Sequence, residues 1–145
     1  MGGELNEAVE MRYLAIDYGA KRTGLAICDP GETIASPLGV IEGHQDLTAK
    51  IADVVTKEGV GAIVLGLPLN MDDSAGGQAK LVFQFAQQLE KVLVIPVYFQ
   101  DERLSSYGAE EKLTAAELTR KKKKKHIDAV AAAEILEAFL EQKKR

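Results

Sequence analysis

The chain has 145 residues, of which 46% are hydrophobic and 28% charged, and both figures are typical of one globular domain that buries its own core. A single cysteine, Cys28, excludes a disulfide framework, and no apolar run approaches the roughly 20 residues that span a bilayer, so we expect a cytoplasmic protein with no membrane partner. The net charge of −4 is unevenly divided, because residues 1–119 carry −9 and residues 120–145 carry +5, and polyanion binding depends on such a local patch more than on the sum.

The first part of the chain predicts three antiparallel strands. Residues 12–19 (RYLAIDYG) and 22–29 (RTGLAICD) are apolar runs joined by a short turn. Residues 33–41 (TIASPLGVI) predict a third, less regular strand with Pro37 near an edge or a bulge. We expect residues 1–10 to form a flexible extension ahead of a single domain over residues 11–145.

Helices and strands alternate in the rest of the chain. Two further apolar runs predict strands at residues 61–68 and 92–102. Apolar side chains at helical spacing predict helices at residues 46–59, 75–91, about 104–118 and about 127–142. The order β-β-β-α-β-α-β-α-α predicts an α/β domain in which a mixed five-stranded sheet has helices on both faces.

Asp17 is the first candidate site residue, because it ends an apolar strand, where an ionised carboxylate needs a partner. Gly19 and Gly24 flank the following turn and allow a backbone or a ligand to come close. Asp17 either satisfies amides of that turn or binds a ligand, and this motif alone leaves both open. Lys21 and Arg22 lie in the same hairpin, where they are able to contact a backbone phosphate.

The stretch QDERLSS places Asp101 and Glu102 at the end of another strand, followed by Arg103. One interpretation is that Asp101 caps the next helix while Glu102 favours the positive end of that helix. The other is that a carboxylate here binds metal while Arg103 neutralises the cluster or meets a phosphate. Asp101 and Glu102 both remain candidates for that carboxylate.

Asp128 lies near the start of the predicted last helix, where a carboxylate also suits the helix dipole. The alanines around it allow this helix to pack closely on the sheet, and packing across the first strand would bring Asp128 toward Asp17. Asp17, Glu102 and Asp128 would then offer hard oxygen ligands for Mg²⁺ or Mn²⁺. Two such ions, roughly 3.5–4 Å apart, promote phosphodiester cleavage.

The loop over residues 66–78 leaves a strand through Gly66 and Pro68, and Asn70 and the following helix amides are able to bind a phosphate. An ordinary strand-to-helix loop explains it equally, and it is not a P-loop, because the Gly-Lys-Ser/Thr ending is absent.

Six consecutive basic residues precede the last helix, and we expect them to form an extended loop because their charges repel one another. They are either a solvated charge run or a grip on several phosphates. They are Arg120, Lys121, Lys122, Lys123, Lys124 and Lys125.

Four motifs together resemble the YqgF family, RNase H-like proteins described as Holliday junction resolvases of the RuvX type or as pre-16S ribosomal RNA nucleases. The motifs are AIDYGAKRTGLAICD, IVLGLPLNMDDSAGGQ, VYFQDERLSS and KKKKKHIDAVAAAEIL, and they span nearly the whole chain. The resemblance implies an RNase H-like fold and metal-dependent nuclease chemistry, with acidic residues matching Asp17, Glu102 and Asp128.

The hypothesis that follows is a Mg²⁺- or Mn²⁺-dependent endonuclease that acts on structured RNA or branched DNA, as a monomer or a homodimer. The alternative is a non-catalytic nucleic-acid-binding module with the same fold. An actin-like phosphotransferase fits the DYG motif, but a chain of this length lacks a second lobe.

Overall fold

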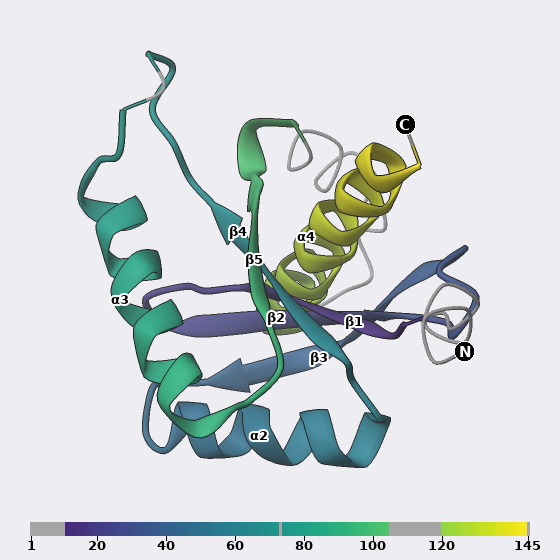
Figure 1. The fold of residues 1–145 in the computed structure, drawn as a ribbon. Helices are drawn as coiled ribbons and strands as arrows, with labels where there is room; N and C mark the ends of the chain where they lie inside the picture. The colour runs from purple at the N-terminus through teal and green to yellow at the C-terminus, as the bar shows by residue number, and fades with distance from the viewer. Residues whose placement is uncertain (1–10, 73, 105–119, 145) are drawn as a thin grey trace.

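The computed structural model describes residues 11–72, 74–104 and 120–144, with side chains for all of these except residues 104 and 120–126. Figure 1 shows a central sheet with helices on both of its faces. The elements in chain order are β1 (Tyr13–Asp17), β2 (Arg22–Cys28), β3 (Ala35–Glu42), α2 (Leu47–Glu58), β4 (Ala62–Leu67), α3 (Gly77–Val92), β5 (Val97–Asp101), the 3₁₀ turn η1 (Glu102–Leu104) and α4 (Arg120–Lys143).

The five strands form one mixed sheet in the order β3-β2-β1-β4-β5. The first three strands pair in antiparallel fashion, whereas β1, β4 and β5 run parallel to one another. The predicted mixed five-stranded α/β architecture is therefore confirmed. Parallel strands end at the same edge of a sheet, so β1 and β5 bring their carboxyl ends to one edge, with β4 between them.

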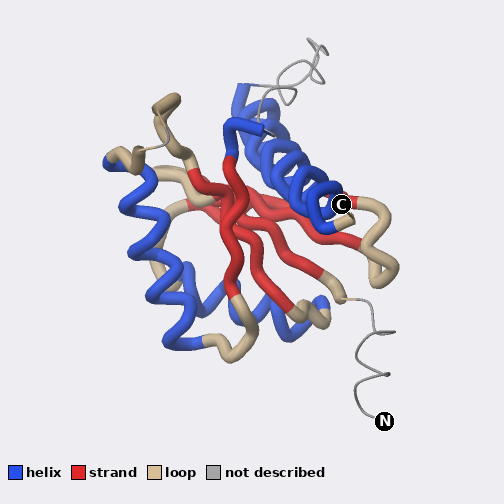
Figure 2. Tube along the Cα trace, turned by 45° about the horizontal axis from the view of Figure 1, so that its top comes forward, coloured by secondary structure: helices blue, strands red, loops and turns tan. Residues whose placement is uncertain are grey.

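Each strand residue selects its face by the two-residue period of a β-strand. Leu14 and Ile16 of β1 pack under α2 and α3, in a cluster that includes Phe85 and Leu89. Tyr13 and Ala15 point the other way, into a cluster with the alanines and leucines of α4. The two clusters bury the inner strands β1, β2 and β4 on both faces, between the two helical layers that Figure 2 illustrates.

β3 is an edge strand, and its pairing with β2 shifts by one residue between Leu25 and Ala26. Pro37 lies at that irregularity, opposite Ala26. The predicted placement of Pro37 at an edge or a bulge is confirmed, since proline has no N–H for a second neighbouring strand.

The strand predicted over residues 92–102 is shorter in the structure. α3 continues through Val92, the Leu93 amide donates to the Leu89 carbonyl at 2.9 Å, and β5 begins only at Val97. Val94 is fully exposed, whereas Leu93 and Ile95 on either side of it pack against the core, so this apolar stretch is a connection that alternates between the core and the surface ahead of β5.

The extended loop predicted for residues 120–125 is wrong, because α4 begins at Arg120 and runs through the lysine run without a break. Lysine is a good helix former, and an established helix extends at the gain of one hydrogen bond for each residue fixed. The predicted helix at about 104–118 and the predicted extension at 1–10 lie outside the described residues, apart from the single turn Glu102–Leu104. No helix in the described part of the chain has the length and apolar character that a membrane crossing needs.

Candidate active site

Asp17 and Glu102 lie at the same end of the sheet. Asp17 ends β1, Glu102 directly follows β5, and β4 pairs in parallel with both strands. Gly66 of β4 leaves the space that the Glu102 side chain fills: a Cβ at Gly66 would lie 2.9 Å from Glu102 Cγ and 3.0 Å from its Oε2. The Glu102 carboxylate therefore lies over β4, on the side of the sheet that α4 covers.

Asp128 reaches the same region from α4. Gly24 pairs with Asp17 across β1 and β2, and a Cβ at Gly24 would overlap the Asp128 carbonyl oxygen. The helix thus passes in backbone contact over β2, beside Asp17. Since α4 begins at Arg120, Asp128 is about two turns inside the helix, and the interpretation as a first-turn carboxylate on the helix dipole is wrong.

Gly24 and Gly66, which were also expected to border loops, lie inside the strands predicted at residues 22–29 and 61–68. Gly24 lies within β2 and Gly66 within β4, and each gives room to a group on the α4 face. Gly19 does lie in the β1–β2 turn, where a Cβ would overlap the Arg22 carbonyl oxygen. Pro68 directly follows β4, as expected.

The electrostatics of these carboxylates differ from those of ordinary surface acids. Burial, and then the charge of Asp128, raise the pKa of Asp17 to about 6. Burial, followed by the charges of Asp17 and Asp101, raises the pKa of Glu102 to about 7. Desolvated carboxylates that repel one another favour a proton or a metal cation between them, and such perturbed groups gather at functional sites.

Arg22 pairs with Asp128 through an Nε–Oδ2 contact of 2.6 Å. The two residues are 106 positions apart, so no sequence pattern could have indicated the pair. Both side chains stay partly accessible, with about a quarter to a third of their surface exposed (29% and 24%). Arg22, expected to face a phosphate, orients the Asp128 carboxylate in this structure.

Asp101 is held by Arg103. The Arg103 side chain donates to both Asp101 carboxylate oxygens, over 2.7 to 3.1 Å, and the Arg103 amide donates to Oδ1 at 2.9 Å. These hydrogen bonds lower the pKa of Asp101. Arg103 Nη1 also donates to the Asn70 carbonyl at 2.7 Å, which ties the β4–α3 loop to the end of β5.

The other residues expected to contact nucleic acid surround this end of the sheet. Lys21 is exposed in the β1–β2 turn, and Asn70 is exposed in the β4–α3 loop, where its amide donates to Ser74 Oγ at 3.1 Å. The six basic residues at 120–125 occupy the first turns of α4, ahead of Asp128, and their side chains lie outside the described part of the structure.

The donors at this site are carboxylate oxygens, the ligands that Mg²⁺ and Mn²⁺ prefer. Within the described residues, no three Asp, Glu, His or Cys side chains come close enough together to hold a metal ion as they stand. Asp17 and Glu102 have raised pKa values in part because neighbouring carboxylates repel their charges. A divalent cation would relieve this repulsion, so the residues fit such an ion chemically.

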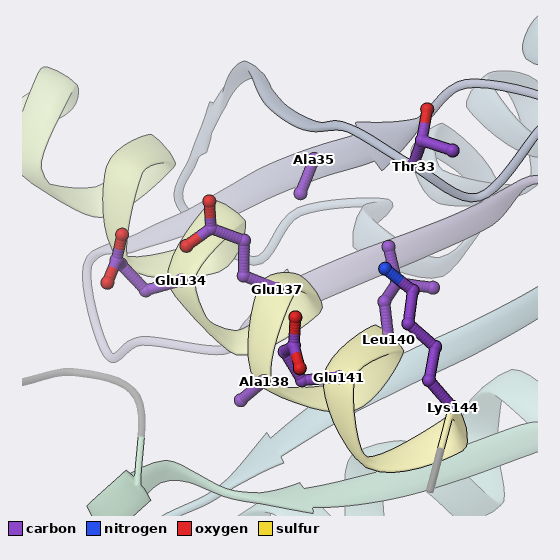
Figure 3. A pocket seen from close by; sticks show the side chains of 8 residues that line it. All are labelled: Thr33, Ala35, Glu134, Glu137, Ala138, Leu140, Glu141 and Lys144. Atoms are coloured by element: carbon purple, nitrogen blue, oxygen red, sulfur yellow. The ribbon is translucent and has the colours of Figure 1, made fainter.

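A groove of about 450 Å³ lies elsewhere, between the outer face of α4 and the start of β3 (Figure 3). Glu134, Glu137 and Glu141 line it, and Thr33 and Ala35 stand at the end of the sheet away from Asp17. With Lys144 as the one cation among these lining residues, the three carboxylates make the groove a poor surface for a phosphodiester backbone.

The family model described as RuvX, Holliday junction resolvase, matches residues 11–142. A protein of Maridesulfovibrio salexigens named "Putative pre-16S rRNA nuclease" is 41% identical over 132 residues, which cover 90% of this chain and 98% of the relative. A protein of Roseiflexus sp. with the same name is 38% identical and covers 92% of this chain and 96% of its own length.

Solved structures with the same fold include resolvases. The Fowlpox virus resolvase in complex with Holliday junction DNA superposes with a TM-score of 0.58 at 12% identity, covering 93% of this chain and 100% of that one. RuvC of Thermus thermophilus gives 0.56 at 16% identity, covering 92% and 97%. Both the resemblance seen in the sequence motifs and the RNase H-like fold that it implied are confirmed.

Proposed function

Since this chain belongs to the RuvX family, and its relatives are named nucleases, we propose that it hydrolyses phosphodiester bonds in structured nucleic acid at the sheet end that carries Asp17 and Glu102. The observation that carries this proposal is that two partly buried carboxylates lie at the ends of β1 and β5, on either side of β4, with pKa values that are raised by desolvation and by adjacent negative charges.

Asp17, Glu102 and Asp128 would hold a divalent cation, Mg²⁺ or Mn²⁺, singly or as a pair. When bound, the metal supplies the Lewis acidity that activates water and stabilises the leaving oxygen. Arg22 keeps the Asp128 carboxylate turned toward the site through its 2.6 Å contact. We favour Glu102 over Asp101 as the second ligand, because Glu102 is close enough to Asp17 for the charge of Asp17 to raise its pKa, whereas hydrogen bonds from Arg103 lower the pKa of Asp101.

Basic and polar groups around the site would hold the nucleic-acid backbone. Lys21 is exposed beside Asp17, and Asn70 and Arg103 border the β4–α3 loop. Residues 120–125 add six cations to the start of α4, enough to neutralise several phosphates. All of these groups lie on turns, loops or helix ends next to the end of the sheet that carries Asp17.

We favour a precursor of 16S ribosomal RNA as the substrate, because the relatives near 40% identity carry that name, whereas the DNA-bound resolvases share only the fold with this chain. A four-way DNA junction is the second substrate to test. Symmetric resolution of a junction needs two active sites and hence a homodimer, while cleavage of one RNA end needs only a monomer.

The test is cleavage of labelled precursor RNA and of a four-way DNA junction, side by side, in Mg²⁺ or Mn²⁺, with the solution mass of the protein measured in parallel. Asp17→Asn and Glu102→Gln should abolish cleavage, and Asp101→Asn should leave a larger residual rate. Asp53→Asn, on an exposed position of α2, is the matched control and should cut at the wild-type rate. Wild-type cleavage by Asp17→Asn would refute the site, and nucleic-acid binding without cleavage in any metal would favour the non-catalytic alternative.

A further inference from the structure

A cavity of about 340 Å³ opens on the other face of the sheet from the proposed metal site, at the same end of β1. Tyr18, which lines the cavity, directly follows Asp17 and packs against the core beneath α2 and α3. Successive residues of an extended chain point to opposite faces. Asp17 therefore belongs to the face of the sheet with the carboxylates, and Tyr18, the next residue, belongs to the opposite face with the cavity.

Three aromatic rings are stacked along the wall of this cavity. The Phe85 and Tyr18 rings lie 4.3 Å apart between centroids with an interplanar angle of 19°, and Tyr18 and His44 lie 4.9 Å apart at 24°. Phe85 is buried and His44 is exposed, so the stack runs from the core to the surface and ends with the imidazole. His44 Nε2 is 2.7 Å from the Gly19 carbonyl, to which it donates, and this bond fixes the ring over the β1–β2 turn.

The rim of the cavity is polar, because Asp46, Thr48 and Gln88 line it. An aromatic platform with a few convergent polar groups is the usual composition of a pocket for a flat heterocycle. The Asp46 carboxylate disfavours a phosphate, but it is able to accept a hydrogen bond from the amino edge of a base. These features suit the base of a nucleotide rather than its backbone.

We propose that this cavity binds one unpaired nucleobase of the nucleic-acid substrate, stacked on the outer ring of the Phe85–Tyr18–His44 series. The inference rests on the proposed function, since a strand whose phosphate lies at Asp17 carries its bases past the end of the sheet. Stacking tolerates every base because each has a π-face. The polar rim adds a preference among bases through contacts with the base edge.

The test uses the full-length protein in EDTA, where no metal supports cleavage, and a short single-stranded RNA that contains one 2-aminopurine. Binding is followed by the fluorescence of that base and by its dependence on salt. Wild-type protein should change the fluorescence of 2-aminopurine. His44→Ala should weaken binding about 5-fold or more, the range found for the loss of one stacked base, with the salt slope unchanged because no phosphate contact is removed.

His44→Phe keeps a flat ring and should restore most of the affinity, and Tyr98→Ala, which removes an exposed aromatic ring from β5, should bind as wild type does. The inference is overturned if wild-type protein leaves the fluorescence unchanged or if His44→Ala binds as tightly as wild type. It is also overturned if the salt slope of binding by His44→Ala is smaller than that of wild type by about 0.7, the contribution of one phosphate contact on a single strand. Because binding is measured without cleavage, an inactive protein that still stacks the base would refute only the proposed function.

Discussion

Replacement of Gly24 by alanine tests whether the backbone contact between β2 and α4 holds Asp128 in place. A Cβ at position 24 would overlap the Asp128 carbonyl oxygen, and it would lie 2.5 Å from the Asp128 carbonyl carbon and 3.2 Å from the Ala129 nitrogen. These atoms belong to a helix backbone, which cannot rotate away as a side chain would, so α4 must move as a unit.

Overpacking lowers the free energy of unfolding by about 1–3 kcal/mol. The lower entropy of alanine in the unfolded chain offsets about 0.4–1 kcal/mol of this loss. A net loss of about 1–2 kcal/mol corresponds to a fall in Tm of roughly 2–8 °C for a domain of this size. The cleavage rate should also fall at temperatures where the variant is still folded, because the displaced helix carries Asp128 away from Asp17.

Gly39→Ala is the matched control. Gly39 lies on the neighbouring strand β3, paired with Leu25, and a Cβ there meets nothing within 4 Å. This variant should be as stable as wild type or slightly more stable. Thermal unfolding by circular dichroism and the cleavage assay measure both variants, and a Tm for Gly24→Ala at or above the wild-type value would refute the close packing of α4.

Three further predictions concern charge. In EDTA at pH 8, Asp17→Asn should unfold at a higher temperature than wild type, although we expect it to be inactive, because the substitution removes a desolvated charge that is repelled by Asp128 and Glu102; a lower Tm would contradict the electrostatic argument. Hydrogen bonds from Thr33 and Ile34 lower the pKa of Asp29 to about 2, so its contribution to stability is present above pH 4 and is lost as the pH falls toward 2. Asp29→Ala should accordingly lower the Tm at pH 6 and match wild type near pH 2, and a constant difference across this range would contradict that assignment. Replacement of all five lysines at 121–125 by glutamine should weaken RNA binding and make it less dependent on salt. The slope of log K against log salt should become shallower by up to about 0.7 for each phosphate that the protein no longer neutralises. An unchanged slope would make these lysines a solvated charge run.

Within the described residues, local patterns along the chain were enough to predict the order of the five strands and of α2, α3 and α4. The two-residue period of β1, β2 and β4 and the helical spacing in α2 and α3 are properties of neighbouring residues, so the mixed sheet and its two helical layers followed from them. The motifs around Asp17, Asp101, Glu102 and Asp128 also marked one end of that sheet as the place to look for a site.

Other features depended on contacts between residues that are distant in sequence. Arg22 meets Asp128 across 106 residues, and Tyr18 and His44 stack across 26, so no local period encodes either pair. The direction in which the chain leaves β5 decides that Arg103 binds Asp101 and that Glu102 lies near Asp17.

The sequence by itself determined which elements form, because hydrophobic periodicity is a local property that the chain satisfies by burying one face or both. Only the tertiary structure decided what the glycines and the lysine run do. Gly24 and Gly66 prove to make room for α4 and Glu102, and the lysines prove to be helical. The physical reason for the glycines is that a close backbone approach depends on what packs from another part of the chain, which adjacent residues do not reveal. The lysines are helical because α4 extends through them, with one hydrogen bond gained for each residue added.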